Sequence, residues 1–238
     1  MLKKYNDVIG IVGGMGSFAT LDFFMRLIKS FPAEKEWDRP RIIIDNNCTI
    51  PSRVRAILYN EAWDEVGDQL ADSVRHLIGA GANILVLACN TSHVFLPEII
   101  NRVPEAEGKF VNIIDSLGET LAATGVTEYR LLASEGTLDS GVYQLYLKKY
   151  GITIEPPDKT EYPLFRSIIE DVKQDMVNPE TAQKLIDAMH QGTNKNVIIG
   201  CTEFPPVYEL CRDQLAAEGY HIYDPLDTTI QKIHAIIK

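Results

Sequence analysis

Residues 83–91, NILVLACNT, carry an apolar run directly before a cysteine, and residues 196–203, NVIIGCTE, repeat the arrangement. Each run is short, rich in aliphatic side chains and followed by a helical pattern, which predicts a buried strand of a parallel sheet. Ligands of open α/β sheets bind outside the carboxyl ends of the strands. The two stretches therefore predict two strand ends at which Cys89 and Cys201 face a ligand site.

The same alternation of strand and helix patterns runs along the whole chain. Strands are expected over residues 8–13, 41–46, 83–88, 111–114, 129–133, 152–154, 196–200 and 220–223. Helices are expected over residues 17–30, 61–80, 92–101, 116–124, 138–149, 162–175, 179–191, 205–217 and 226–237. This order predicts the α/β class, with parallel sheets covered by helices on both faces.

Two further pairs of segments indicate an internal duplication. Residues 112–117, NIIDSL, resemble residues 221–226, HIYDPL, and residues 11–17, IVGGMGS, resemble residues 131–137, LLASEGT. We expect two pseudo-symmetric lobes, each a parallel sheet flanked by helices, that face each other across a cleft holding the active site. The first lobe is expected to contain residues 1–114 plus 216–238, and the second lobe residues 115–215.

Composition and charge exclude several classes of protein. The chain has 238 residues, 23 basic against 33 acidic side chains and a formal net charge of −10. No cluster of Lys and Arg exceeds a pair, so no nucleic-acid-binding surface is expected. The longest apolar run, residues 84–89, is far shorter than the roughly 20 residues that span a membrane. Residues 1–7 lack the features of a secretory signal, so we expect a cytoplasmic location with reduced thiols.

The chemistry that the repeated cysteines suggest is proton transfer on two faces of one carbon. A lone cysteine at a strand end is most often a packing residue, but two thiols at equivalent positions of facing lobes suit the inversion of a stereocentre. One thiolate removes a proton and the opposite thiol returns one, so no cofactor is required. Cys48 and Cys211 have no counterpart in the repeat, and we expect them to be packing residues.

Five segments resemble motifs of the aspartate/glutamate racemase family. They are residues 9–16, IGIVGGMG; residues 46–53, NNCTIPSR; residues 88–93, ACNTSH; residues 136–144, GTLDSGVYQ; and residues 200–205, GCTEFP. The resemblance covers nearly the whole chain and implies a cofactor-independent amino-acid racemase with two similar α/β lobes, assembled as a homodimer. Glu203 resembles the aspartate racemase branch, since glutamate racemases usually carry His at that position.

The resemblance also implies roles for individual residues. Cys89 and Cys201 are the implied catalytic pair. The implied substrate-binding residues are Gly14, Met15, Arg53, Asn90, Thr91, Ser92, Lys173 and Thr202. Arg53 is expected to bind the side-chain carboxylate in a two-pronged contact, with Lys173 as the second cation. The implied substrate is a small acidic amino acid, aspartate first and glutamate second, and no metal ion is implied.

Several positions depart from the usual pattern of that family. Ser17 stands where proline is usual, and Cys48 and Thr49 replace a more usual Pro-Glu pair. Ser134 and Glu135 occupy a loop in which Thr is common. The departures leave both strand-end thiols in place, and so they bear on the substrate preference rather than on the reaction.

Other functions stay open at the level of sequence. Residues 14–19 fit the GxGxxA dinucleotide fingerprint, and Asp45 ends the next strand, which would indicate a NAD(P)-dependent oxidoreductase. Cys89, His93 and Cys201 offer ligands for zinc, but no fourth ligand is evident. A third alternative is a related isomerase or decarboxylase that has the same cysteine-bearing lobes and acts on maleate, hydantoins or arylmalonates. The last alternative is a two-lobed small-molecule binding protein without catalysis.

Overall fold

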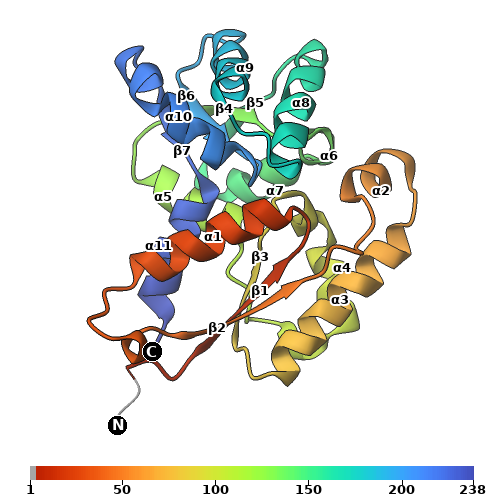
Figure 1. Cartoon of the computed structure of the whole chain (residues 1–238). Coiled ribbons are helices and arrows are strands. Elements are labelled where there is room, and N and C mark those ends of the chain that lie inside the picture. Colours follow the sequence, from red (N-terminus) through yellow and green to blue (C-terminus); the bar gives the residue numbers. More distant parts are fainter. Residues whose placement is uncertain (1–3) are drawn as a thin grey trace.

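Two parallel sheets organise the chain in the computed structural model, which describes residues 4–238. The first sheet has the strand order β2-β1-β3, and the second has the order β5-β4-β6-β7 (Figure 1). The strands are β1 (Val8–Gly13), β2 (Arg41–Asn46), β3 (Ile84–Leu87), β4 (Glu128–Leu132), β5 (Thr153–Glu155), β6 (Asn196–Ile199) and β7 (His221–Tyr223). The pairs are parallel in both sheets, which confirms the predicted two-lobed α/β class.

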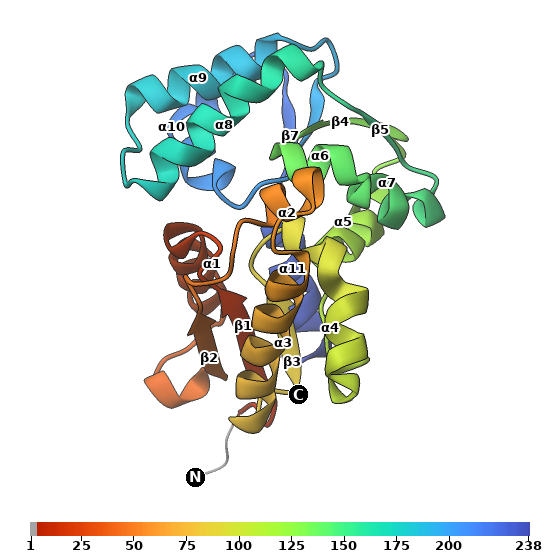
Figure 2. The same ribbon diagram turned by 90° about the vertical axis from the view of Figure 1, so that its right-hand side faces the viewer.

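Helices cover both sheets. They are α1 (Ser17–Ser30), α2 (Arg53–Tyr59), α3 (Trp63–Gly79), α4 (Leu96–Arg102), α5 (Ile113–Ala122), α6 (Glu135–Ser140), α7 (Val142–Leu147), α8 (Tyr162–Lys173), α9 (Pro179–His190), α10 (Phe204–Ala217) and α11 (Pro225–Ile236). Figure 2 shows α8, α9 and α10 together as one layer on the second sheet. None of the helices within residues 4–238 combines the length and the apolar character that crossing a bilayer requires.

The prediction of a strand over residues 111–114 is wrong. A single bridge forms nearby, between Leu85 and Phe110, and the chain then turns into α5. The Asn112 side chain accepts hydrogen bonds from two backbone N–H groups of the first helical turn. This N-cap ends the extended conformation, so the apolar residues that follow form the buried face of a helix.

Two helical regions also differ from the expectation. No helix was expected over α2, but Ser52 caps it by accepting a hydrogen bond from the backbone N–H of Arg55. The single helix expected over residues 138–149 is divided into α6 and α7 at Gly141. Its φ of 67° lies in the left-handed region, which glycine adopts without steric cost.

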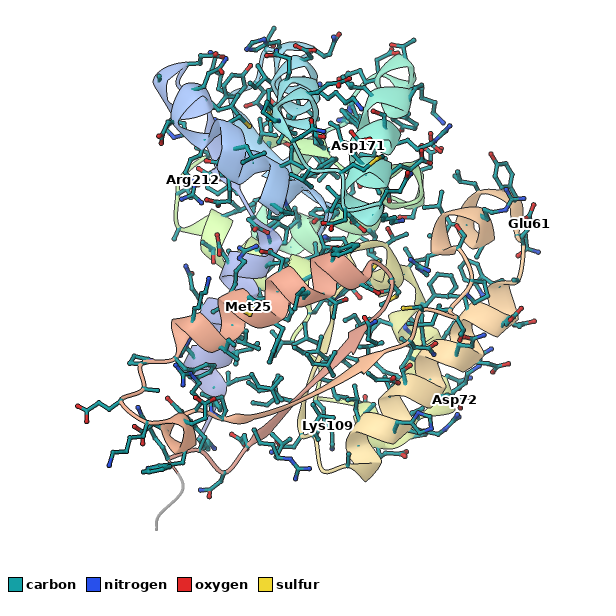
Figure 3. All side chains as sticks on the ribbon, viewed as in Figure 1. Met25, Glu61, Asp72, Lys109, Asp171 and Arg212 are labelled. Carbon is teal, nitrogen blue, oxygen red and sulfur yellow. The ribbon has the colours of Figure 1, made fainter. Side chains whose placement is uncertain are left out.

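One apolar core joins the two lobes. Ile9 and Ile11 of the first sheet belong to the same cluster of buried side chains as Tyr129 and Leu131 of the second. Side chains fill the space between the ribbons in both lobes (Figure 3). Residues 216–238 do not belong to the first lobe alone, since they contribute β7 to the second sheet, while α11 packs against α1 and α5. The other expected lobe limits stay a prediction.

Gly118 in α5 provides a test of this packing. A Cβ atom at this position would lie 2.3 Å from Cδ2 of Tyr150. Gly118→Ala is therefore expected to lower the free energy of unfolding by about 1–3 kcal/mol, because the ring or the helix must move. Urea titration measures the change.

Gly79→Ala is the matched control, because no described heavy atom lies within 4 Å of a Cβ built at Gly79. This variant should be as stable as the wild type or slightly more stable, since alanine favours helix. Equal destabilisation by both substitutions would contradict the close packing of α5.

Candidate active site

A cavity of about 420 Å³ lies between the lobes, at the carboxyl ends of the strands. The first lobe contributes Met15, Ser52, Arg53, Val54, Arg55, Leu58, Tyr59, Cys89, Asn90 and Thr91 to its wall. The second lobe contributes Ser134, Glu135, Arg166, Ile169, Glu170, Lys173, Cys201, Thr202 and Glu203. The cavity thus brings together both cysteines and every residue expected at the site except Gly14 and Ser92.

The two cysteines occupy matching places in the two lobes. Cys89 follows the last residue of β3 by two positions, and Cys201 follows the last residue of β6 by two positions. The preceding residue donates a backbone hydrogen bond to the neighbouring strand in each lobe, from Ala88 to Val12 and from Gly200 to Leu132. Both thiols are largely buried, with 8% of each residue exposed. Their equivalence agrees with the repeat found in the sequence.

The surroundings of the two thiols differ, because a carboxylate lies beside Cys201. The Cys201 Sγ donates to Oε2 of Glu203 at 2.9 Å, and the Thr202 hydroxyl donates to the same oxygen at 3.3 Å. Burial, and then the negative charge and hydrogen bond of Glu203, hold the pKa of the Cys201 thiol well above its usual value. Gly16 makes room for this carboxylate, since a Cβ there would lie 2.6 Å from Glu203 Oε1. Cys201 is therefore a protonated thiol with an acceptor at hand.

Arg53 holds the loops around the cavity and keeps one donor free. Its Nη1 donates to the carbonyls of Ile50 and Pro51 at 3.2 and 2.9 Å, and its Nη2 donates to the carbonyl of Met15 at 2.7 Å. The buried Nε–H has no partner within residues 4–238. A buried donor without a partner costs roughly 1–3 kcal/mol, and Arg53 is a residue of the cavity wall.

Hydrogen bonds between the lobes fix the residues that follow Cys89. The Tyr143 hydroxyl donates to Oδ1 of Asn90 at 2.7 Å. The Thr91 hydroxyl lies 3.0 Å from the hydroxyl of Ser134 and 2.8 Å from that of Thr137. The Asn90 Nδ2, like the Arg53 donor, is buried without a partner in the described part of the chain. These contacts orient a second unpaired donor at the cavity wall.

Three further cations line the cavity of this acidic protein, namely Arg55, Arg166 and Lys173. Arg55 forms an ion pair with Glu61, and Arg166 forms one with Glu135. Within residues 4–238, the Lys173 ammonium group makes no ion pair or hydrogen bond. Lys173 is therefore the cation most available to a second carboxylate.

Two residues expected to bind substrate, Gly14 and Ser92, lie outside the cavity wall and make contacts within the protein. Gly14, with φ of 82°, packs so closely that a Cβ would lie 2.4 Å from the backbone of Asn47, and its N–H donates to the Thr20 hydroxyl at 3.2 Å. Ser92 is fully buried and donates to the carbonyl of Cys89 at 2.7 Å. Neither residue lines the cavity. This close packing is a sufficient reason for glycine at position 14.

His93 is a buried residue behind the cavity. Its Nδ1 lies 3.0 Å from the carbonyl oxygen of Cys89, and its Nε2 lies 3.3 Å from the backbone nitrogen of Ile113. Nδ1 therefore donates and Nε2 accepts, which requires the neutral ring. Burial lowers the pKa of His93 to about 4. Both nitrogens are engaged, and residues 4–238 hold no cluster of three potential metal ligands.

The other two cysteines differ from each other. Cys211 is buried in the core, as expected for a packing residue. Cys48 is exposed, so its expected packing role is wrong. Its Sγ lies 3.1 Å from the Ser17 hydroxyl and 3.3 Å from Nδ2 of Asn46. These polar neighbours come from the ends of β2 and α1, which the sequence did not place together.

Sequence reasoning missed the parts played by Glu203, Tyr143, Ser134 and Arg166. Glu203 served only as a mark of the family branch, although its place two residues after a strand-end thiol could have suggested a proton acceptor. Tyr143 and Ser134 lie within the quoted second-lobe motifs, but their contacts with the first lobe depend on tertiary structure. Arg166 carries no sequence signal that sets it apart from a surface arginine.

Comparison with known proteins gives consistent matches. The sequence model of the family described as Asp/Glu/Hydantoin racemase matches residues 12–233. Glutamate racemase of Jannaschia sp. (strain CCS1) is 28% identical over 229 residues, covering 85% of this chain and 74% of that protein. The broad specificity amino-acid racemase RacX of Bacillus subtilis (strain 168) is 24% identical over 217 residues, covering 87% and 90%. The solved structure of Picrophilus torridus aspartate racemase has a TM-score of 0.80 at 24% identity, covering 97% and 94%.

The fold and these matches together define the class of protein, an isomerase of the racemase type. The chain belongs to the Asp/Glu/Hydantoin racemase family, whose sequence model covers nearly its whole length. Family membership confirms the resemblance seen in the motifs and argues against the NAD(P)-dependent alternative.

The buried His93 predicts a pH dependence of stability. As the pH falls from about 6.5, the unfolded chain takes up a proton on this histidine while the folded chain resists protonation down to about 4. The contribution is therefore complete above about pH 6.5 and is lost toward pH 4, for a total of about 3 kcal/mol. His93→Gln should show a flatter dependence of unfolding free energy on pH than the wild type.

The control is His76→Gln, because the His76 side chain is 78% exposed. Guanidinium titrations at several pH values between 4 and 7.5 measure the free energy of unfolding of the wild type and both variants. A pKa difference of one unit between the folded and unfolded chain corresponds to about 1.4 kcal/mol. An identical pH dependence in His93→Gln and the wild type would mean that this ring is not buried in the neutral form.

Proposed function

We propose that the chain interconverts L- and D-aspartate by proton transfer between Cys89 and Cys201, without a cofactor. The main support is the convergence of both thiols on one cavity from equivalent strand ends. Unpaired donors at Arg53 and Asn90 and the unpaired Lys173 suit a substrate with two carboxylates. Glutamate is the second candidate, since the matched relatives include proteins named glutamate racemase and broad specificity amino-acid racemase.

In the proposed reaction, the thiolate of one cysteine takes the α-proton of the bound amino acid. The electron pair of the broken C–H bond passes toward the α-carboxylate. The thiol of the other cysteine then delivers its proton to the opposite face of the same carbon, where a new C–H bond forms. The two cysteines exchange protonation states, so no proton, electron or co-reactant is consumed. The reverse reaction uses the same groups with their roles exchanged.

Glu203 prepares Cys201 for the role of base in this proposal. A thiol with a raised pKa has to lose its proton before it attacks the α-hydrogen. The Glu203 carboxylate already accepts the hydrogen bond from that thiol, and so it is the nearest site to which this proton can pass. When Cys201 acts as the acid instead, its raised pKa keeps the proton in place for delivery.

Donors along the cavity wall stabilise the charge that develops on the α-carboxylate. Asn90, Thr91 and Thr202 lie beside the two thiols, and the buried Nδ2 of Asn90 needs an acceptor. Such donors act strongly in a site with little water, because they are already oriented. We assign the second carboxylate to Lys173 and to the free Nε–H of Arg53.

A homodimer and a cytoplasmic location remain parts of the proposal that rest on the family resemblance and on the sequence. Light scattering on the purified protein tests the dimer. Fractionation of the source cells tests the location.

Serine substitutions test the two thiols. Cys89→Ser and Cys201→Ser should each lower racemisation of aspartate by at least about 100-fold, because a serine hydroxyl is too weak an acid to replace a thiol. In deuterated water, each variant retains one competent face. The two variants should therefore exchange the α-proton of opposite enantiomers. Chiral chromatography and mass spectrometry measure the two effects.

Cys48→Ser is the control, since Cys48 is exposed and lies outside the cavity wall. It should racemise aspartate at the wild-type rate. Wild-type rates in both cavity variants would rule out the two-thiol reaction. Release of carbon dioxide from arylmalonates, or isomerisation of maleate, in place of racemisation would identify the related alternative activities.

Lys173→Met tests the recognition of the second carboxylate. A hydrogen bond to a charged group contributes about 1.5–3 kcal/mol, so kcat/KM for aspartate should fall about 10- to 100-fold. Inhibition by succinate, which carries two carboxylates, should weaken by a similar factor, whereas inhibition by butyrate should not change.

Lys232→Met serves as the control, because Lys232 forms its ion pair with Glu119 and lies outside the cavity wall. This variant should bind both acids as the wild type does. Equal weakening of succinate and butyrate by Lys173→Met would assign Lys173 to the shared α-carboxylate rather than to the second one.

A further inference from the structure

Tyr143 connects the surroundings of the two thiols although it does not line the cavity. It comes from α7 in the second lobe and is fully buried. Its hydroxyl reaches Oδ1 of Asn90, the residue that follows Cys89 in the first lobe, at 2.7 Å. It also lies under Gly200, the residue before Cys201, where a Cβ would be 3.0 Å from the phenol oxygen. The absence of a side chain at Gly200 thus lets the phenol pass to Asn90.

The hydrogen bond between Tyr143 and Asn90 determines which way the amide points. The amide oxygen cannot donate, so the phenol donates and the oxygen accepts. Burial, followed by the negative charge of Asp224, keeps the pKa of Tyr143 well above its usual value, and the phenol therefore retains its proton. With Oδ1 held in this way, Nδ2 must lie on the other side of the amide. Rotation of the amide would leave the buried phenol proton without this acceptor.

The amide nitrogen is the only part of this arrangement left unsatisfied. Asn90 lines the cavity, 3% of the residue is exposed, and Nδ2 has no hydrogen-bond partner within residues 4–238. Buried side-chain donors are rarely left unpaired without a functional reason. A carboxylate bound in the cavity that Asn90 lines would supply the acceptor that this donor lacks.

We propose that Tyr143 is a positioning residue, which holds the Asn90 amide with its N–H donor toward the carboxylate of the substrate. The inference rests on the proposed racemase function for the identity of that carboxylate. Tyr143 touches no reacting atom, and its effect on the reaction passes through Asn90. Because Tyr143 belongs to the second lobe and Asn90 to the first, the donor is correctly set only when the two lobes are packed together.

A double-mutant cycle tests this dependence. Steady-state racemisation of aspartate is measured for the wild type, Tyr143→Phe, Asn90→Ala and the double variant. Tyr143→Phe is expected to lower kcat/KM about 10-fold, mainly through a higher KM, since one charge-assisted hydrogen bond is misplaced. In the Asn90→Ala background the same substitution should have no further effect. Losses that multiply in the double variant would overturn the proposal.

Tyr129→Phe is the matched control for the loss of a buried phenol. Tyr129 is fully buried in the second lobe, and its hydroxyl bonds to Thr124 rather than to a cavity residue. The kcat/KM of the Tyr129→Phe variant should stay at the wild-type value. Thermal unfolding of both Phe variants separates the loss of stability from the loss of activity. An equal loss of kcat/KM in both variants would reduce Tyr143 to a packing role.

Nuclear magnetic resonance provides a readout that needs no substrate. The side-chain NH₂ signals of Asn90 in ¹⁵N-labelled protein are assigned by their absence in Asn90→Ala. They should shift and broaden in Tyr143→Phe, because the amide is free to rotate, and stay unchanged in Tyr129→Phe. Unchanged signals in Tyr143→Phe would overturn the proposal even if the wild type racemised aspartate. Conversely, a wild type that racemised no acidic amino acid would overturn the proposed function and leave this readout valid.

Discussion

The fixed position of one lobe against the other is the constraint on which the site depends. Two thiols can act on opposite faces of one small molecule only if their separation is held. Here one apolar cluster contains side chains of both sheets, and polar contacts at Asn90 and Thr91 cross the boundary close to the cavity. Close packing makes such a core resistant to small displacements. The lobes therefore behave as two halves of one site rather than as separate units.

The cavity wall combines satisfied and unsatisfied polar groups in a consistent way. Backbone carbonyls occupy most donors of Arg53, and these bonds hold the loops that follow β1 and β2. The donors left over, Arg53 Nε and Asn90 Nδ2, have no partner among residues 4–238, and a buried donor of this kind costs roughly 1–3 kcal/mol. Under the proposed function, the carboxylates of the substrate would offset this cost, so the same two donors would favour binding of the substrate. A chain with a net charge of −10 repels anions at long range, and under the same proposal these local donors would counter that repulsion.

The main features of the fold and the two thiols could be predicted because they depend on local patterns. The spacing of apolar residues that marks a strand or a helix can be recognised within a short segment of sequence. Cys89 and Cys201 lie at the ends of two such strands. The segment at 111–114 misled the prediction, since its apolar residues fit a strand and the helix cap at Asn112 acts through a single side chain. The orientation of Asn90 could not be predicted at all. It depends on a partner 53 residues away, in the other lobe.

The carboxylate of Glu203 accepts from one thiol, whereas no carboxylate among residues 4–238 hydrogen-bonds to Cys89. Under the proposed racemisation, this inequality meets a thermodynamic limit. Enantiomers have equal free energies in water, so the equilibrium constant between them is unity and kcat/KM must be the same in both directions. Two unequal bases can give the enantiomers different kcat values only if the KM values differ by the same factor. The enantiomer that saturates the enzyme at the lower concentration must also turn over more slowly, and the net flux always runs toward the racemic mixture.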